Sequence, residues 1–359
     1  MITAKAPGKM ILIGEYAVLY GAEALVCAMD CFASVNLISS GHNQFEISSP
    51  SLSITNLPFK VLEPGKIKFG NQADLDAIDK LHFFRIVFEE VNKIVHFNHK
   101  DIRPAHIEIG TEDFYSADGN YKYGFGSSAA MTVALLASLL TSAGLLGLYN
   151  TEDFFQLAFQ IHRMAQGNLG SGIDIAASVY GNVLCYNFEN KNEISVGRGQ
   201  PVDCWDELLA VPIWAGHSTS TRQMVQRVIT LRETSPKLFD QIMNALIRCS
   251  ENGCRSYIRK DKFTFFESIR EFNRILSDLG NKSKTPIVSE AHGKLIELLA
   301  GSDMVYKPSG AGGGDIGVVF CDSGNAVQKV RWTLKDTGFQ VLDNRITGKG
   351  VHVTNSEDN

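Results

Sequence analysis

The sequence KYGFGSSAAMTVALLASLL, residues 122–140, joins a glycine-rich turn to a long apolar segment. Gly124 and Gly126 allow the backbone to turn tightly and to approach a ligand closely. A helix that begins near Ser127 or Ser128 directs unpaired N–H groups and a partial positive charge out of this turn. Such a helix start is an anion site, and phosphate is its usual anion. The stretch therefore predicts a phosphate-binding turn at the start of a helix.

The apolar segment that follows has no charged residue from Ala129 to Leu148 and is about as long as a bilayer span. Polar residues and glycines interrupt it, and no basic flank follows, so we expect a buried core helix. The chain start also differs from a secretory signal, because Gly14 and Glu15 end a short apolar run. We therefore expect a protein without a membrane span.

Composition and charge narrow the class of protein. The 359 residues are 44% hydrophobic and 20% charged, as in ordinary globular proteins, and this length favours two domains. A formal net charge of -5 provides no basic surface for nucleic acid. The seven cysteines are odd in number and lack metal-site spacing, so we expect reduced thiols and a cytoplasmic protein. These features favour a small-molecule partner over nucleic acid or a membrane.

Hydrophobic periodicity predicts an α+β chain. Residues 50–72 are expected to be irregular, residues 191–200 form a candidate linker, and the tail after Val353 is expected to fray. The expected domains are residues 1–195 and residues 196–359. Strands are predicted at 2–7, 10–13, 24–39, 106–109, 182–188, 208–215, 303–306 and 316–320, with two more near the C-terminus, and helices at 74–97, after 126, at 152–166, in 167–181, at 219–300 (three or four) and at 324–335.

Three glycine-dense sites, at residues 7–15, 124–128 and 310–315, are the main chemical signal in the chain. No segment matches G-x-x-x-x-G-K-[ST], so a P-loop is excluded, and no glycine turn matches G-x-G-x-x-G after a strand. Each site alone is compatible with an ordinary turn. Together with Lys9 and Asp174, the three sites predict one phosphate site assembled from distant segments.

Three motifs, PGKMILIGEYAVLYG (7–21), YGFGSSAAM (123–131) and KPSGAGGGDIG (307–317), occur in this order over nearly the whole chain. They resemble the motifs of the GHMP small-molecule kinases, a family that includes galactokinase, homoserine kinase, mevalonate kinase and phosphomevalonate kinase. The resemblance implies an N-terminal ATP-binding domain like domain 2 of ribosomal protein S5. It also implies a C-terminal GHMP kinase domain with a ferredoxin-like arrangement.

Two further segments, HRMAQGNLGSGIDIAASVYG (162–181) and WAGHSTST (214–221), resemble phosphomevalonate kinases more than mevalonate kinases. Mevalonate kinases typically have a glutamate near position 162, where this chain has His162, and a further glycine at Asp315. The missing glutamate implies a Mg²⁺ shell that differs from that of mevalonate kinase. The chain also departs from the common pattern at Asn120, often a proline, and at Phe125, usually a leucine, but the glycines and serines are unaffected.

The resemblance implies roles for the residues that hold ATP and transfer its phosphoryl group. Lys9 is expected to be a point charge near the transferring group. Asp174 is expected to face the acceptor, as a base or as an electrostatic orienter, and the sequence leaves both roles open. Ser128 is expected to reach Mg²⁺. The expected cofactor-binding residues are Gly124, Gly126, Ser127, Ser128, Ala129, Gly310, Gly312 and Gly313.

The acceptor is expected to contact hydroxyl, charged and backbone groups from several segments. For Glu15 and Tyr16 the alternative is that they stabilise the turn, and for His217 it is an ordinary surface or core histidine. The simpler explanation for residues 124–129 is a capped core helix, and for residues 310–315 it is a hairpin. For Asp174 it is a helix cap, and for Lys9 it is a surface lysine. The expected substrate-binding residues are Lys9, Glu15, Tyr16, Ser171, Gly172, His217, Ser218, Ser220, Ala311 and Asp315, with Thr219 and Arg222 beside them.

The activity implied by the resemblance is ATP-dependent phosphorylation of 5-phosphomevalonate to 5-diphosphomevalonate in isoprenoid synthesis. Within the family, the alternative is a kinase that acts on a hydroxyl, of mevalonate or of a sugar. An ATP-dependent phosphomevalonate or diphosphomevalonate decarboxylase shares the fold, as does a non-catalytic sensor. The sensor is disfavoured because Lys9, Ser128 and Asp174 are all present. The sequence leaves the acceptor and the possibility of a homodimer open.

Overall fold

The computed structural model describes residues 1–39, 44–63, 65–71, 73–191, 194–217 and 221–356. Its larger sheet has nine strands in the path β13-β1-β2-β6-β3-β4-β5, with β7 also paired to β2 and β8 paired to β7. Pairing in this sheet is antiparallel except between β3 and β6. The strands are β1 (Ile2–Ile13), β2 (Ala24–Ser39), β3 (Phe45–Ser49), β4 (Ile54–Glu63), β5 (Lys66–Phe69), β6 (Ala105–Gly110), β7 (Val183–Lys191), β8 (Ile194–Val202) and β13 (His352–Asn355).

The smaller sheet is antiparallel and runs in the order β10-β11-β9-β12. Its side chains alternate between two apolar clusters, because successive residues of a strand point to opposite faces. Val318 and Phe320 pack with α7 and α8, whereas Val319 packs with α9 and α10. The strands are β9 (Leu209–Trp214), β10 (Met304–Pro308), β11 (Ile316–Cys321) and β12 (Gln340–Val341).

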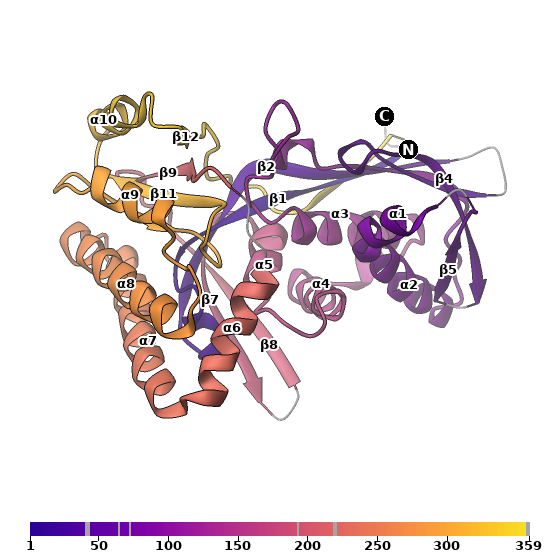
Figure 1. Ribbon diagram of the computed structural model, residues 1–359. Helices are drawn as coiled ribbons and strands as arrows, with labels where there is room; N and C mark the ends of the chain where they lie inside the picture. Colours follow the sequence, from indigo (N-terminus) through magenta and orange to yellow (C-terminus); the bar gives the residue numbers. More distant parts are fainter. Residues whose placement is uncertain (40–43, 64, 72, 192–193, 218–220, 357–359) are drawn as a thin grey trace.

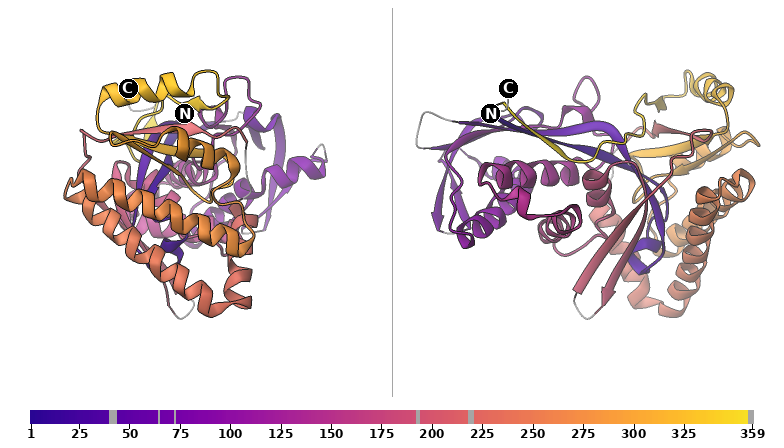
Figure 2. Two further views of the ribbon diagram at one scale, coloured as in Figure 1. Left: turned by 60° about the vertical axis from the view of Figure 1, so that its left-hand side comes forward. Right: turned by 180° about the vertical axis from the view of Figure 1, so that it is seen from behind.

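Helices α2 to α5 lie together against the long strands β1 and β2, whereas α7 and α8 lie at the other end of the molecule beside the smaller sheet (Figure 1). The view from behind shows the same arrangement and the curvature of β1 and β2 over the helices (Figure 2). The helices are α1 (Leu75–Lys80), α2 (His82–Phe97), α3 (Ser127–Ser142), α4 (Thr151–Ala165), α5 (Ile173–Tyr180), α6 (Thr221–Thr234), α7 (Pro236–Ile258), α8 (Lys262–Ser283), α9 (Glu290–Leu298) and α10 (Gly324–Leu334).

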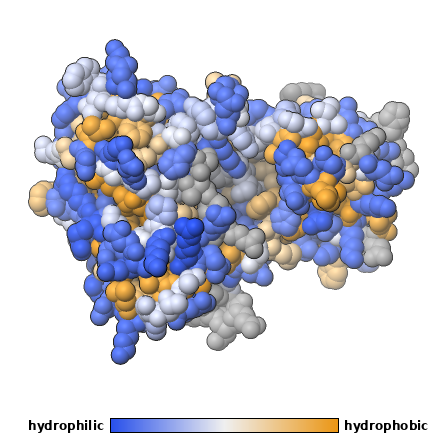
Figure 3. All heavy atoms as spheres, in the orientation of Figure 1, coloured by the Kyte–Doolittle hydropathy of each residue, from blue (hydrophilic) through white to orange (hydrophobic). Residues whose placement is uncertain are grey.

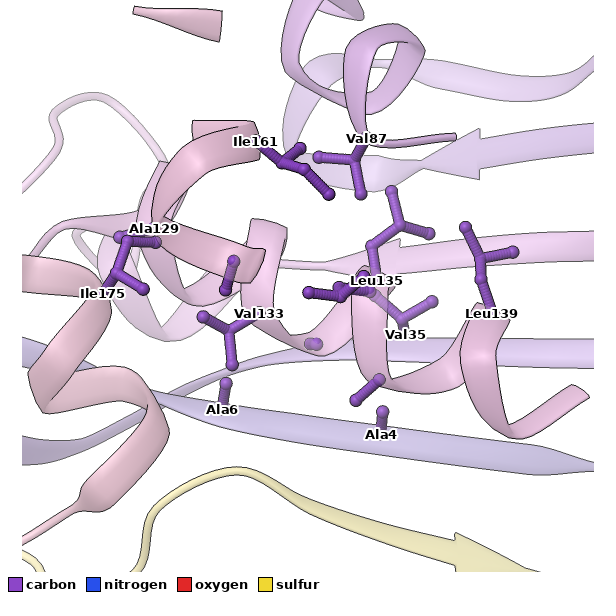
Figure 4. Close-up of a cluster of buried hydrophobic side chains, with 14 of the residues drawn as sticks. Ala4, Ala6, Val35, Val87, Ala129, Val133, Leu135, Leu139, Ile161 and Ile175 are labelled. Atoms are coloured by element: carbon purple, nitrogen blue, oxygen red, sulfur yellow. The ribbon is translucent and has the colours of Figure 1, made fainter. Parts of the chain in front are cut away.

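The predicted core helix after the glycine turn is α3, and it is buried along its length. Figure 4 shows Val133 and Leu135 of this helix between the sheet, marked by Ala4 and Ala6, and Val87 of α2. A helix that is apolar on every side lies in a protein core or in a membrane. Within the described residues no helix is long and apolar enough to cross a membrane. The absence of charged residues from this segment is therefore explained by burial.

The mixed α+β architecture confirms the predicted fold class, but several predicted boundaries were wrong. Residues 2–13 form one strand, because the Pro7–Gly8 step is a register shift within β1 and not a turn. The predicted helix at 74–97 is divided at Leu81, which has φ -87° and ψ 10°, into α1 and α2. Residues 50–72 were expected to be irregular but contain β4 and β5, which pair with each other.

Two segments expected outside the sheet are strands of it. Residues 194–202 of the candidate linker region form β8, which pairs with β7. Thr354 and Asn355 of the tail expected to fray belong to β13, and Asn355 lies opposite Ile2, whereas residues 357–359 lie outside the described residues. The sheet supplies each segment with backbone partners, which short-range patterns do not reveal. The division at residue 195 remains a prediction, and this position lies inside β8.

The surface in the orientation of Figure 1 is largely hydrophilic, with separate apolar patches over both ends of the molecule (Figure 3). The exposed large apolar side chains come from different elements and include Leu75, Phe97, Phe263 and Trp332. Scattered apolar residues of this kind are ordinary for a folded protein. All seven cysteines lie in the described ranges and are free thiols.

Candidate active site

Lys9 of β1 lies between two of the three glycine-dense segments. Its backbone N–H donates to the carbonyl of Phe125 at 2.7 Å, and its ammonium donates to the carbonyl of Gly124 at 3.2 Å. A side chain added at Gly310 would lie 3.8 Å from the Lys9 ammonium nitrogen. The structure therefore brings the first, second and third motifs together at one lysine, as the sequence predicted.

Two glycines allow the loop before α3 to approach Lys9 and Asp315. Gly124 and Gly126 have φ values of 97° and 80°, in the left-handed region that disfavours side chains. A Cβ on Gly124 would lie 2.6 Å from the Cβ of Asp315, and one on Gly126 would lie 3.2 Å from Cγ of Lys9. Both positions therefore require glycine for conformation and for space.

A cavity of 140 Å³ opens beside Lys9 and is lined by residues from both halves of the chain. Asp174 lines it from the first turn of α5, and its carboxylate accepts a hydrogen bond from the backbone N–H of Ile175 at 3.0 Å. The predicted residues that line this cavity are Lys9, Glu15, Tyr16, Ser171, Asp174, Gly310 and Ala311. The cavity thus places one cation and several carboxylate, hydroxyl and backbone groups around a space of small-molecule size.

The helices α3 and α5 both begin at this site without a side-chain cap. Their N-cap residues are Gly126 and Gly172, with φ values of 80° and 75°. An uncapped helix start leaves backbone N–H groups and the positive end of the helix dipole available to an anion. The amide of Ala129 already donates to the carbonyl of Gly126 at 3.1 Å. The amides of Ser127 and Ser128 are therefore better placed than that of Ala129 to bind an anion.

Ser128 faces a histidine where a mevalonate kinase would have a glutamate. The hydroxyl oxygen of Ser128 lies 3.5 Å from Nε2 of His162, a buried residue whose ring packs on Phe83. Burial lowers the pKa of His162, although the negative charge of Asp174 opposes this effect. Mg²⁺ prefers oxygen ligands. The described residues contain no group of three His, Cys, Asp or Glu side chains placed to hold a metal.

Glu15, predicted to bind substrate, forms a buried ion pair with Lys307 of β10. Both side chains are almost fully enclosed, and the same carboxylate oxygen accepts a hydrogen bond from the N–H of Gly310 at 3.3 Å. Its second oxygen is buried without a hydrogen-bond partner. Burial lowers the pKa of Lys307, and Glu15 opposes this effect. One carboxylate oxygen of Glu15, in the first motif, therefore binds both Lys307 and Gly310 of the third motif.

The third motif divides into two parts. Ala311 accepts a hydrogen bond from the hydroxyl of Tyr16 at 2.7 Å, so residues 310–311 face the cavity. Gly313 instead donates to the carbonyl of Ile287 at 2.9 Å, and a Cβ on Gly312 would lie 2.2 Å from that same oxygen. The described contacts therefore bring Gly310 to Lys9 and direct Gly312 and Gly313 toward the α8–α9 connection.

His217, predicted to bind substrate, is exposed and packs against the third motif. Its Nε2 lies 2.5 Å from the carbonyl oxygen of Gly313, and its own carbonyl accepts from the N–H of Asp315 at 2.6 Å. It does not line the cavity beside Lys9. The predicted residues Ser218 and Ser220, and Thr219 between them, lie outside the described residues.

Known proteins that are similar to this chain are GHMP kinases, the family whose three motifs meet at Lys9 in the structure. The model of the GHMP kinases N terminal domain matches residues 87–182. The mevalonate kinase of Archaeoglobus fulgidus is 30% identical over 243 residues, which cover 68% of each chain. This chain belongs to the GHMP kinase family. The mevalonate kinase of Thermococcus sibiricus is 26% identical over 368 residues, 98% of each chain.

Solved structures show the same fold as this GHMP kinase. A Lin0012 protein from Listeria innocua has a TM-score of 0.85 and 23% identity, covering 99% of both chains. Streptococcus pneumoniae phosphomevalonate kinase, solved with phosphomevalonate and AMPPNP, has a TM-score of 0.77 and 17% identity, covering 96% of this chain and 100% of that one. At these identities the likeness establishes the fold alone.

The sequence reasoning missed two lysines of this GHMP kinase. Lys122 directly precedes the second motif, and its pKa is lowered by burial and by Lys9 and raised by Asp315. Lys307 opens the third motif and is fully buried. The sequence does indicate a role for Lys307, because it lies between apolar residues at the end of a strand. A lysine buried in such a place requires a charged or hydrogen-bonding partner. Lys122 follows a polar loop and looks like a surface residue from sequence alone.

The buried Glu15–Lys307 pair yields a stability prediction. Lys307→Met leaves the Glu15 carboxylate buried without its cation, so the free energy of unfolding should fall by about 3–5 kcal/mol. The double variant Glu15→Gln/Lys307→Met should be more stable than Lys307→Met, because it removes the uncompensated charge. Urea unfolding of the three proteins measures both effects. Lys329→Met is the matched control, since it breaks the exposed Lys329–Asp303 pair and should cost less than about 1 kcal/mol. Equal losses in Lys307→Met and Lys329→Met would contradict the buried-pair account.

His292 yields a pH prediction for the same region. Its Nε2–H donates to the carbonyl of Gly314 at 3.0 Å, and its Nδ1 accepts from the hydroxyl of Tyr306 at 2.8 Å. Burial lowers the pKa of His292 to about 4. The folded-state pKa lies below the unfolded value of about 6.5. The contribution of His292 to the free energy of unfolding is therefore fully present above about pH 6.5 and is lost as the pH falls toward about 4.

Between pH 7 and pH 5, the free energy of unfolding of the natural protein should therefore fall about 2 kcal/mol more than that of His292→Gln. Urea titrations at the two pH values measure this difference, and groups common to both proteins cancel. His352→Gln, at an exposed histidine, should follow the natural protein. Parallel pH profiles for the natural protein and His292→Gln would show that His292 is not held neutral.

Proposed function

We propose that this GHMP kinase transfers the γ-phosphoryl group of ATP to 5-phosphomevalonate. A bond forms between a phosphate oxygen of the acceptor and the γ-phosphorus, the bond from that phosphorus to the β-phosphate oxygen breaks, and ADP and 5-diphosphomevalonate leave. The observation that carries phosphoryl transfer is the Lys9 ammonium beside Gly124 and Gly310. A fixed cation at this point offsets the negative charge of the transferring group.

The proposed ATP-phosphate site is the start of α3, where the N–H groups of Ser127 and Ser128 face outward from the glycine loop. The pneumococcal relative of the same fold, solved with AMPPNP, supports ATP as the nucleotide. Mg²⁺ supplies charge neutralisation at the β- and γ-phosphates when it is bound. Among the described residues we assign Ser128 to it, with nucleotide and water oxygens as the remaining ligands.

Lys9 on the cavity wall, with two further lysines near it, supports an acceptor that is itself a phosphate. The charge of Lys9 acts on both Lys122 and Lys307, because it lowers the pKa of each. Lys9 thus lies close enough to influence each of the other two lysines, whose charges are opposed by Asp315 at Lys122 and by Glu15 at Lys307. A phosphate monoester acceptor carries nearly two charges at pH 7 and gains from such a site.

A hydroxyl acceptor, as in mevalonate kinase, is the second candidate. The observation in its favour is that the curated relatives of similar length, such as that of Thermococcus sibiricus, are mevalonate kinases. An alcohol must lose its proton during attack, and Asp174 is the carboxylate that lines the cavity near Lys9. His162 beside Ser128, in place of a glutamate, weighs against this candidate.

A coupled assay of ADP release with mevalonate, phosphomevalonate, mevalonate diphosphate and several sugars tests the proposal. We expect the highest kcat/KM with phosphomevalonate and no release of CO₂. Turnover with mevalonate but not with phosphomevalonate would transfer the assignment to the second candidate. CO₂ release would indicate a decarboxylase, and nucleotide binding without turnover on any acceptor would indicate a sensor.

The variant Asp174→Asn tests whether Asp174 acts as a general base or only orients the acceptor electrostatically. A phosphate acceptor is already largely ionised at pH 7, so removal of the carboxylate should lower kcat less than about 100-fold, below the usual contribution of a general base. The same change in a kinase that acts on a hydroxyl should cost more. A complete loss of activity with unchanged folding and ATP affinity would make Asp174 a true base.

Lys122→Met tests whether the acceptor phosphate uses this lysine. Loss of one charge-assisted hydrogen bond, worth about 1.5–3 kcal/mol, should raise KM for phosphomevalonate by roughly 10- to 100-fold. KM for ATP should change little, and Lys122→Arg should recover most of the affinity. Lys335→Met, at an exposed lysine after α10, is the control. An unchanged KM for phosphomevalonate in Lys122→Met would remove Lys122 from the acceptor site.

A further inference from the structure

Two cysteines that are distant in sequence meet between the larger sheet and α7. Cys185 lies on β7 opposite Leu25 of β2. Successive residues of β7 point to opposite faces, and Leu184 and Tyr186 belong to the core around α3, whereas Val183 and Cys185 pack with the cluster that includes α7. The Cys185 thiol is therefore directed toward α7 by the register of the sheet.

The α7 side of this contact is fixed by a neighbouring hydrogen bond. Ser250 donates from its hydroxyl to the carbonyl of Glu23, just before β2, at 2.5 Å. Cys254 is four residues later, on the same face of the helix, and is fully buried. The thiols of Cys185 and Cys254 belong to one packed cluster and lie close enough across this interface for each to shift the pKa of the other. Two sulfur atoms are thus held together by packing on both sides.

The two thiols differ in exposure and in pKa. Cys185 is partly exposed and Cys254 is buried, and the contact between them lowers the pKa of Cys185 and raises the pKa of Cys254. The thiolate is the form that reacts with oxidants. All seven cysteines are described, and the pKa of each of the other six is raised; these are Cys27, Cys31, Cys204, Cys249, Cys254 and Cys321. Cys204 is the most useful comparison, because it is exposed yet has a raised pKa.

We propose that Cys185 is a site of oxidative modification and that Cys254 resolves it into a disulfide between β7 and α7. A peroxide oxidises the Cys185 thiolate to a sulfenic acid and is itself reduced to water or an alcohol. The Cys254 sulfur then attacks the Cys185 sulfur, the S–O bond breaks, an S–S bond forms and water leaves. The two thiols together supply two electrons, which balance the reduction of one peroxide.

The cross-link would enclose a segment that lines the active site. The 3₁₀ turn η1 (Ala17–Tyr20) lies between the two elements: Tyr20 packs on Phe239 of α7 at 5.1 Å between ring centroids, and the carbonyl of Gly21 accepts from Asn187 of β7 at 2.9 Å. Val18 and Leu19 of this turn line the cavity beside Lys9. The disulfide would therefore fix α7 and β7 on either side of a wall of the acceptor cavity.

The test is peroxide treatment of the folded, full-length protein, followed by proteolysis and mass mapping without reduction. We expect a peptide pair joined through Cys185 and Cys254, with the loss of two hydrogen atoms, that separates again on addition of a thiol. In Cys254→Ser, dimedone should trap the sulfenic acid on Cys185. Alkylation of Cys185 by iodoacetamide at pH 7 should be roughly tenfold faster than that of Cys204.

Cys204→Ser is the matched control and should form the disulfide at the rate of the natural protein, whereas Cys185→Ser should form none. The map of the natural protein requires no variant, so a loss of stability in Cys254→Ser leaves the test intact. A peroxide-treated protein in which Cys204 reacts first, or in which Cys185 stays reduced, would overturn the proposal. These outcomes are read by mass and do not depend on the identity of the acceptor.

Discussion

Burial of α3 on every side is the constraint on which the active site depends. Val133, Leu135 and Leu139 are fully buried between the sheet and the neighbouring helices, so the helix cannot rotate or slide without opening the core. Its first turn is consequently fixed against β1, where Lys9 is anchored through both its backbone and its ammonium. A helix start that moved would provide the same N–H groups without a defined position for a phosphate, and catalysis requires that position.

The two halves of the chain are joined at the same place by interactions of different kinds. The Glu15–Lys307 pair connects the turn after β1 to β10 in a fully buried setting. Tyr121, just before the second motif, stacks on Trp214 of β9 with ring centroids 3.8 Å apart and donates to Gln340 of β12 at 3.0 Å. The loop that leads into α3 is thus attached to the smaller sheet, so any movement between the halves would reach the glycine turn directly.

The sequence was sufficient for the features that depend on local chemistry. Paired glycines and serines before an apolar run predicted the start of α3, and hydrophobic periodicity predicted the helix at 152–166, which is α4. Features that depend on distant partners were not predictable. Strand β4 contains a proline, β8 contains a proline and two glycines, and β5 is only four residues long, so pairing in the sheet, rather than local propensity, makes these segments strands. In the same way, composition cannot distinguish Gly310, which lies beside Lys9, from Gly312, which packs on Ile287.

The pairing of β13 with β1 has a consequence for how the chain folds during synthesis. Ile2 lies opposite Asn355, so β1 obtains its second neighbour only when residues 352–355 have left the ribosome. Until then β1 presents an unpaired edge along part of its length, and contacts of such long sequence separation form slowly because a large loop must close first. The larger sheet is therefore among the last parts of the molecule to be completed, although β1, the neighbour of its edge strand β13, is synthesised long before that edge.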